Sequence, residues 1–275
     1  MTINLKKARD FIYLNGALWE KALYRHLFEG GPISHFHNAL KSYKNDDNGF
    51  GHGFEYDIKC PDSHPLALEF MLGVFRDTGL PVGDVFEGAA EWVERNQNED
   101  GTLVNPATIL HYPYSPWWGG GGQTIPASIT GNLLLHGLCT EQVAFYTSKW
   151  VKENLNDEQI QKTEWLFMNY HAVDYYTNVE QTEENLALKE AAIKQVIKCA
   201  EAVPEKQYFT FFQFAPMPDS AVAKATPKPL MEKFLNYLEA SQREDGGWDD
   251  EHGLSYWQPY FTIVILNALR NYGRL

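Results

Sequence analysis

The stretch Gln242-Arg243-Glu244-Asp245-Gly246-Gly247-Trp248 decides the fold that this sequence predicts. It follows a segment whose apolar residues have helical spacing, and it precedes a second such segment, which begins at Pro259. Glycine readily adopts the left-handed conformation that closes a helix, and proline is tolerated in the first helical turn, where its missing N–H would have no partner. The stretch therefore predicts a helix, a glycine turn, a loop and a second helix.

Two further stretches repeat this pattern. Asn45-Asp46-Asp47-Asn48-Gly49-Phe50 and Gln97-Asn98-Glu99-Asp100-Gly101-Thr102-Leu103 each contain an Asp/Asn-Gly turn followed by an apolar residue. A proline again precedes or opens the next helix, at Pro65 and at Pro126. Self-similarity of this kind indicates a chain built from stacked supersecondary units.

Helical periodicity extends over most of the chain, and strand patterns are almost absent. The segment 5–28 predicts one long helix or two short ones broken near Asn15-Gly16. Apolar residues predict further helices over about 33–43, 66–78, 83–97, 126–138, 140–154, 157–168, 170–178, 183–201, 228–242 and 259–272.

The segment from Gln242 to Trp248 resembles the Gln/Trp repeat of the squalene cyclase and protein prenyltransferase superfamily, and the segment around Gly101 resembles a degraded copy. The resemblance implies an all-α fold, an α/α toroid in which helix hairpins form two concentric rings with long ordered loops at the rim. Residues 49–57 and 214–220 are also similar to bacterial proteins described as prenyltransferase-like, but this likeness supplies no activity. We expect residues 1–275 to form one toroid domain, because the repeats lie towards both ends of the chain.

Charge and composition limit the partners that we expect. The sequence has 23 Lys and Arg against 36 Asp and Glu, and its net charge of -13 opposes binding to nucleic acid or anionic membranes. The longest strongly apolar stretch, 261–266, is far shorter than the roughly 20 residues of a transmembrane helix, and the N-terminus does not resemble a secretory signal. Cys60, Cys139 and Cys199 form no Cys-x-x-Cys motif and are expected to be reduced. We expect a cytoplasmic protein without a transmembrane segment.

The long connection 44–65 carries the densest group of ionisable side chains. Such crowding shifts pKa values when the groups are partly desolvated, as acid–base catalysis requires. The alternative is structural, with Asp62 and Ser63 capping the next helix. The candidate catalytic residues of this connection are His52, Glu55, Asp57 and Asp62, and His64 belongs to the same group.

A second acidic group follows Trp248 and adds Asp249 and Asp250 as catalytic candidates. Class II terpenoid cyclases carry their acid in an Asp-x-Asp-Asp motif, but here Gly247 stands where the first Asp would be. The Asp-Asp-x-x-Asp motif of class I synthases and the Asp-x-Cys zinc pair of protein prenyltransferases are also missing. We therefore expect no cofactor and no metal through these motifs.

The pair His35-x-His37 could be half of a metal site, because imidazoles are good zinc ligands. Residues two apart on a helix face different directions, which favours a structural role for both histidines.

Aromatic side chains concentrate in the loops after the turns. Their faces can stabilise a carbocation or stack on a sugar ring. For Trp248 and Trp257 the alternative is that they pack neighbouring repeats together. The candidate substrate-binding residues are Tyr112, Trp117, Trp118, Trp248 and Trp257.

Three functions remain open at this point. The first is a terpenoid cyclase-like or prenyltransferase-like protein that binds an isoprenoid or another apolar small molecule in a central cavity, with carboxylate or His acid–base chemistry. The second is a carbohydrate-active α/α-barrel hydrolase or lyase that uses Asp57 with Asp249 or Asp250 as paired carboxylates. The third is a non-catalytic binding or scaffold module.

Overall fold

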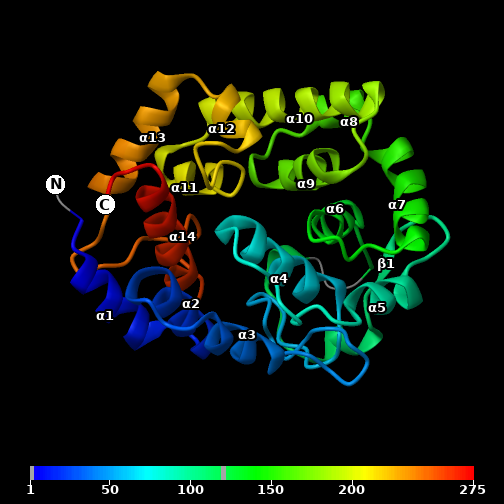
Figure 1. Cartoon of the computed structure of the whole chain (residues 1–275), viewed down its shortest axis with the longest axis horizontal. Coiled ribbons are helices and arrows are strands. Elements are labelled where there is room, and N and C mark those ends of the chain that lie inside the picture. Colours follow the sequence, from blue (N-terminus) through cyan, green and yellow to red (C-terminus); the bar gives the residue numbers. More distant parts are fainter. Residues whose placement is uncertain (1–2, 119–121) are drawn as a thin grey trace. The chain divides into compact units, whose positions relative to one another are not determined.

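The computed structural model describes residues 3–118 and 122–275, and this part of the chain is mostly helical, as the sequence predicts (Figure 1). The two short strands, β1 (Leu103–Val104) and β2 (Gln123–Thr124), pair antiparallel with Leu103 opposite Thr124. The α-helices are Leu5–Asn15 (α1), Leu18–Glu29 (α2), Ile33–Lys41 (α3), Pro65–Thr78 (α4), Ala89–Asn96 (α5), Ala127–Leu135 (α6), Glu141–Asn154 (α7), Asp157–Lys162 (α8), Tyr170–Asn178 (α9), Glu183–Ala202 (α10), Tyr208–Phe211 (α11), Ala221–Ala225 (α12), Lys228–Ala240 (α13) and Gln258–Asn271 (α14).

Local backbone chemistry sets several helix boundaries. The segment 5–28 forms two helices, and the Gly16 N–H bonds to the Ile12 carbonyl at the end of α1. Helix α5 begins six residues later than predicted, because Gly88 adopts a left-handed φ of 75° directly before it. The prediction for α9 agrees with the structure at both ends.

The three repeat turns share one backbone geometry, which confirms the repeat at the level of single hydrogen bonds. In each turn, a backbone N–H donates to the carbonyl four residues later and an Asp side chain accepts from that later residue's N–H. The N–H to carbonyl pairs are Asn45 with Gly49 at 2.9 Å, Asn98 with Thr102 at 2.8 Å and Arg243 with Gly247 at 2.9 Å. The accepting carboxylates are Asp47, Asp100 and Asp245.

The residue with left-handed backbone conformation shows how the three turns align with one another, and this alignment differs from the one that the sequence suggests. It is occupied by Gly101 with φ 91° and by Gly246 with φ 98°, but in the first turn by Asn48 with φ 70°. Asparagine tolerates this conformation better than most residues, so Asn48, and not Gly49, is the equivalent of the other two glycines. The apolar residue two positions further on is buried in every copy: Phe50, Leu103 and Trp248.

The chain divides into two compact units. Unit 1 comprises Met1–Ala39, Trp165–Phe167 and Ile193–Leu275, and unit 2 comprises Leu40–Glu164 and Met168–Ala192. That residues 1–275 form one domain stays a prediction.

Unit 1 contains both ends of the chain. Helix α14 packs against α1, α2 and α13. The repeat residue Gln242 joins the two ends, since its Oε1 accepts from the Asn4 N–H at 2.8 Å and its Nε2 donates to the Asn4 carbonyl at 3.2 Å. A Cβ atom on Gly246 would lie only 2.2 Å from the Lys7 carbonyl carbon, so glycine permits the close approach of α1 to this turn.

Unit 2 is built around α6, which is buried from Ala127 to Leu133 and packs against α4, α7 and α9 (Figure 1). A Cβ atom on Gly131 would lie 2.3 Å from the Asp174 carbonyl oxygen, so α6 and α9 are in backbone contact at this point. Within the described residues, no helix combines the length and the apolar character needed to cross a membrane.

Candidate functional site

The candidate site lies in unit 2 and begins with α4, an apolar helix that carries one acidic residue near its start, Glu69. His64 caps this helix, since its Nδ1 accepts the Ala67 N–H at 3.2 Å, and Pro65 occupies the first helical position. Most of α4 is buried, and only 9% of the Glu69 side chain remains exposed. The helix thus places a carboxyl group in a largely apolar environment.

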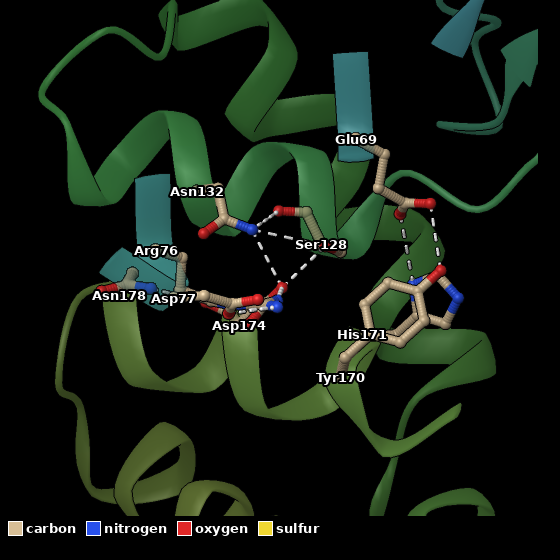
Figure 2. Close-up of polar contacts among 9 residues, drawn as sticks. All are labelled: Glu69, Arg76, Asp77, Ser128, Asn132, Tyr170, His171, Asp174 and Asn178. Carbon is tan, nitrogen blue, oxygen red and sulfur yellow. Dashed lines mark hydrogen bonds and ion pairs between the residues drawn. The ribbon is translucent and has the colours of Figure 1, made fainter. Parts of the chain in front are cut away.

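Helix α9 brings two polar side chains to this carboxyl group. The Tyr170 hydroxyl donates to Glu69 Oε2 at 3.0 Å, and His171 Nδ1 lies 3.7 Å from Glu69 Oε1. Figure 2 shows Glu69 pointing from α4 toward both residues. Neither Oε1 of Glu69 nor Nδ1 of His171 has a hydrogen-bond partner within the described residues.

Burial leaves both groups uncharged at neutral pH. It raises the pKa of Glu69 to about 8, although the Tyr170 hydrogen bond opposes this shift, and it lowers the pKa of His171 to about 3. The contact between them is therefore not an ion pair. Because the Tyr170 hydroxyl donates to Oε2, we place the carboxyl proton on Oε1, on the side of His171 Nδ1, and a neutral imidazole with its proton on Nε2 can accept there.

A charged network lies beside this acid. The guanidinium of Arg76 donates to Asp77 at 2.8 Å and to Asp174 at 2.6 Å, and both carboxylates are almost fully buried. Ser128 and Asn132 of α6 also donate to Asp174, at 2.7 and 2.9 Å (Figure 2). One carboxylate of α9 therefore ties α4, α6 and α9 together.

The network also positions the acid. Glu69 and Arg76 are seven residues apart, about two turns along one face of α4, and Tyr170 and Asp174 are one turn apart on α9. The two helices are thus fixed to each other at two points, one of which is the Glu69 contact.

A second carboxyl group with a raised pKa lies on the loop before α4. Burial and, to a smaller extent, the negative charge of Asp57 raise the pKa of Glu55 to about 8. The Asp57 N–H donates to Glu55 Oε2 at 2.9 Å. The Asp57 carboxylate itself accepts from the Ser115 hydroxyl at 2.8 Å and from Trp117 Nε1 at 3.0 Å. The structure thus brings together three of the residues that the sequence singles out, Glu55, Asp57 and Trp117.

The other candidates of unit 2 have mostly local partners. His52 is exposed, has a left-handed φ of 57° and lies 2.8 Å from Asn45 Oδ1 through its Nε2. Asp62 is exposed and accepts from the Thr108 hydroxyl, and it does not cap α4, a role that His64 has instead. Tyr112 is exposed, and Trp118 packs on a small apolar cluster around Ile109.

The candidates of unit 1 have structural contacts. Asp249 is exposed and pairs with Arg243 at 2.5 Å, whereas Asp250 is buried and accepts two backbone N–H groups of its own turn. Trp248 is buried and donates to the Leu238 carbonyl at 2.9 Å, and Trp257 stacks on Phe261. These contacts match the structural alternative for both tryptophans.

Unit 1 also has a surface pocket of about 420 Å³ beside the third repeat turn. It is lined by Asp10, Phe11, Leu14, Asn15, Arg243, Asp245 and Gln258. None of the candidate catalytic residues lines it.

Metal ligands do not gather in the described part of the chain, where no three His, Cys, Asp or Glu side chains are placed to share an ion. His35 and His37 both lie on α3, where His35 is exposed and His37 is half-buried.

Comparison of the sequence with models of protein families gives no match, and comparison with curated proteins gives none either.

The sequence did not single out the residues around Glu69. One signal was available, because Glu69 interrupts the apolar run 66–72, and Ser128 and Asn132 interrupt a second apolar helix. A polar residue inside a buried helix needs a partner. Nothing local in the sequence, however, identified Tyr170, His171 or Asp174 as those partners.

Proposed function

We propose that this protein is a cytoplasmic α/α toroid that binds an isoprenoid or another apolar small molecule and acts on it by proton transfer. The observation that carries the proposal is the arrangement of Glu69, Tyr170 and His171 in unit 2. It combines a protonated carboxyl group with a neutral imidazole, and Glu69 Oε1 lies 3.7 Å from His171 Nδ1. A proton donor and a proton acceptor are the two groups that a proton-transfer enzyme needs.

In the proposed reaction, Glu69 Oε1 donates its proton to a carbon–carbon double bond of the substrate, which leaves a carbocation. His171 Nδ1 then removes a proton from a neighbouring carbon, and a new double bond or ring results. The proton returns from His171 to Glu69, so the net reaction is an isomerisation or cyclisation. Tyr170 holds the carboxyl group in place through Oε2.

Two further observations support the toroid and the apolar ligand. The three repeat turns have the same hydrogen bonds, as expected for stacked helical units, and the third turn carries the residues that resemble the terpenoid cyclase and prenyltransferase superfamily. Burial also keeps Glu69 protonated at neutral pH, and such a site suits a substrate that is itself apolar.

The first test is native mass spectrometry of the freshly purified full chain, followed by organic extraction and identification of any bound molecule. We expect a prenyl chain or a polycyclic lipid. Absence of any prenyl chain or polycyclic lipid would contradict the proposal, whether or not a sugar is also bound.

A second test uses the extracted molecule as substrate for Glu69→Gln and for Glu91→Gln, a control at an exposed position on α5. We expect Glu69→Gln to lose turnover at least about a hundredfold, the usual contribution of general acid catalysis, without a fall in its thermal midpoint near neutral pH. Unchanged turnover would exclude Glu69 as the acid.

A second candidate function is a carbohydrate-active hydrolase or lyase. The observation that favours it is that unit 2 contains two carboxyl groups, Glu55 and Glu69, whose pKa values are raised to about 8, mainly by burial, as the acid of a glycoside hydrolase requires. Turnover of an oligosaccharide that Glu55→Gln and Glu69→Gln each abolish would favour this candidate.

A further inference from the structure

Exposed apolar side chains gather on one segment of unit 2. Monomeric proteins seldom concentrate large apolar groups on their surface unless something binds there. Trp117 is 54% exposed, Tyr114 41% and Tyr112 40%. We call these three residues the aromatic platform. Val104 and Leu110, on the same segment, are also exposed.

Backbone hydrogen bonds hold this segment against the Glu55–Asp57 loop. The Lys59 N–H donates to the Pro113 carbonyl at 3.0 Å, and the Ser115 N–H donates to the Asp57 carbonyl at 2.8 Å. Between them, Ile58 and Tyr114 form an antiparallel bridge. The aromatic platform is therefore ordered by the protein itself, which lowers the entropy cost of binding.

The side chain of Asp57 fixes the orientation of Trp117. Its Oδ2 accepts the indole N–H at 3.0 Å, while its Oδ1 accepts the Ser115 hydroxyl at 2.8 Å. The indole N–H of Trp117 is thus already used inside the protein, although more than half of the side chain is exposed. What Trp117 can offer a ligand is its ring surface.

We propose that the aromatic platform binds a saccharide, with one sugar ring stacked on Trp117. The C–H face of a sugar ring is an apolar surface that packs on an indole, while its hydroxyl groups are hydrogen-bond donors. Among the polar side chains of these two segments, the Asp62 carboxyl group is exposed, and a carboxylate is a good acceptor for such hydroxyl groups.

Other ligands with an affinity for aromatic side chains fit less well. A proline-rich peptide offers carbonyl acceptors and needs donors such as an indole N–H, but that of Trp117 is bound to Asp57. Single-stranded nucleic acid stacks on aromatic rings, but its phosphates are repelled by a chain with a net charge of -13.

This proposal does not depend on the proposed function, because it does not involve Glu69. The test measures binding of cellohexaose, maltohexaose and chitohexaose to the full chain by saturation-transfer NMR and titration calorimetry. We expect at least one hexasaccharide to bind, with saturation transferred from aromatic protons to the sugar. Absence of binding for all three at millimolar concentration would overturn the proposal.

Four variants locate the site. Trp117→Ala should weaken binding about tenfold or more because it removes the stacking surface, whereas Trp117→Phe should retain much of it because a ring remains. Trp165→Ala, at a tryptophan of unit 1 that is 48% exposed, should bind like the unchanged protein. Glu91→Gln, the exposed control on α5, should also keep saccharide binding, and because the Trp117 variants leave Glu69 in place, their result is separate from the proposed function.

Equal binding by Trp117→Ala and the unchanged protein would overturn the proposal, and so would binding of a proline-rich peptide in place of the sugars. Because Trp117 is mostly exposed, the alanine variant should fold, and its thermal midpoint verifies this.

Discussion

Glu69 makes the pH dependence of stability a test of the site. Its pKa is about 8 in the folded protein and about 4.3 in an unfolded chain. Below about pH 4 the Glu69 carboxyl group is protonated in both the folded and the unfolded protein, but between these two pKa values it is protonated only in the folded protein. Stability attributable to Glu69 is therefore complete at low pH and is lost as the pH rises through about 8, with a slope of up to about 1.4 kcal/mol per pH unit.

Glu69→Gln cannot titrate but can still accept the Tyr170 hydrogen bond. We expect its free energy of unfolding to fall less between pH 5 and pH 8 than that of the unchanged protein, whereas Glu91→Gln should keep the original slope. Urea unfolding at several pH values measures these slopes. Parallel curves for Glu69→Gln and the unchanged protein would show that Glu69 is ionised in the folded state at neutral pH.

Arg76 is the cation that two buried carboxylates share. Asp77 and Asp174 are 2% and 3% exposed, so Arg76→Met leaves both without their guanidinium. We expect this variant to lose about 3–5 kcal/mol of stability, as for other buried ion pairs that lose one partner.

The matched control is Arg9→Met, because Arg9 and Asp10 form an exposed pair, with 42% and 55% of their side chains accessible. Its loss of stability should be much smaller than that of Arg76→Met, because solvent screens an exposed ion pair. Chemical denaturation measures both variants, and equal losses would mean that the buried network contributes no more than a surface pair.

At the scale of elements, the contact between α6 and α9 depends on Gly131. A methyl group there would lie 2.3 Å from the Asp174 carbonyl oxygen, so Gly131→Ala must push the two helices apart. We expect a loss of about 1–3 kcal/mol, as in overpacked cores.

Gly73 of α4, in contrast, has room for a methyl group. The nearest side-chain atom to a Cβ atom added there would be Arg76 Nη2 at 3.6 Å. Gly73→Ala should therefore gain about 0.5–1 kcal/mol from helix propensity alone. Thermal unfolding of both variants tests this, and a stabilised Gly131→Ala would show that α6 and α9 are not in backbone contact.

The helices differ in how well the sequence predicts them. Helices with long apolar periodicity and clear end signals, such as α4 and α9, were predicted almost to the residue. Helix α5 was predicted too long because Gly88 breaks a pattern that periodicity alone continues. The short helices α11 and α12, in a segment rich in Phe and Pro, were missed because four or five residues are too few to show a helical period.

The site was harder to predict than the elements. The sequence identified Glu55, Asp57 and Trp117, because ionisable and aromatic residues crowd two long loops. It missed the contact between Glu69 and Tyr170, which are about a hundred residues apart and meet because α4 and α9 both pack against α6. A site formed by one loop can be predicted from the ionisable and aromatic residues that crowd that part of the sequence. A site formed by side chains of different helices can be identified only once the packing of those helices is known.

At the scale of the whole molecule, charge decides which form of an isoprenoid the protein should bind. The chain has 36 acidic against 23 basic residues, and its net charge of -13 repels a diphosphate. Synthases that bind prenyl diphosphates offset this repulsion with Mg²⁺ held by an Asp-Asp-x-x-Asp motif, but here Asp46-Asp47 continues to Phe50.

We therefore expect farnesol to bind at least about tenfold more tightly than farnesyl diphosphate, a difference of about 1.4 kcal/mol. Neither Mg²⁺ nor a chelator should change the affinity for farnesol, and raising the salt concentration should narrow the difference because it screens the repulsion. Competition against a fluorescent lipid measures both ligands. Tighter binding of the diphosphate in the presence of Mg²⁺ would mean that the protein has a phosphate-binding site that its net charge and its motifs do not indicate. Ionisation of the diphosphate could then start the reaction, and proton transfer from Glu69 would lose its support as the initiating step.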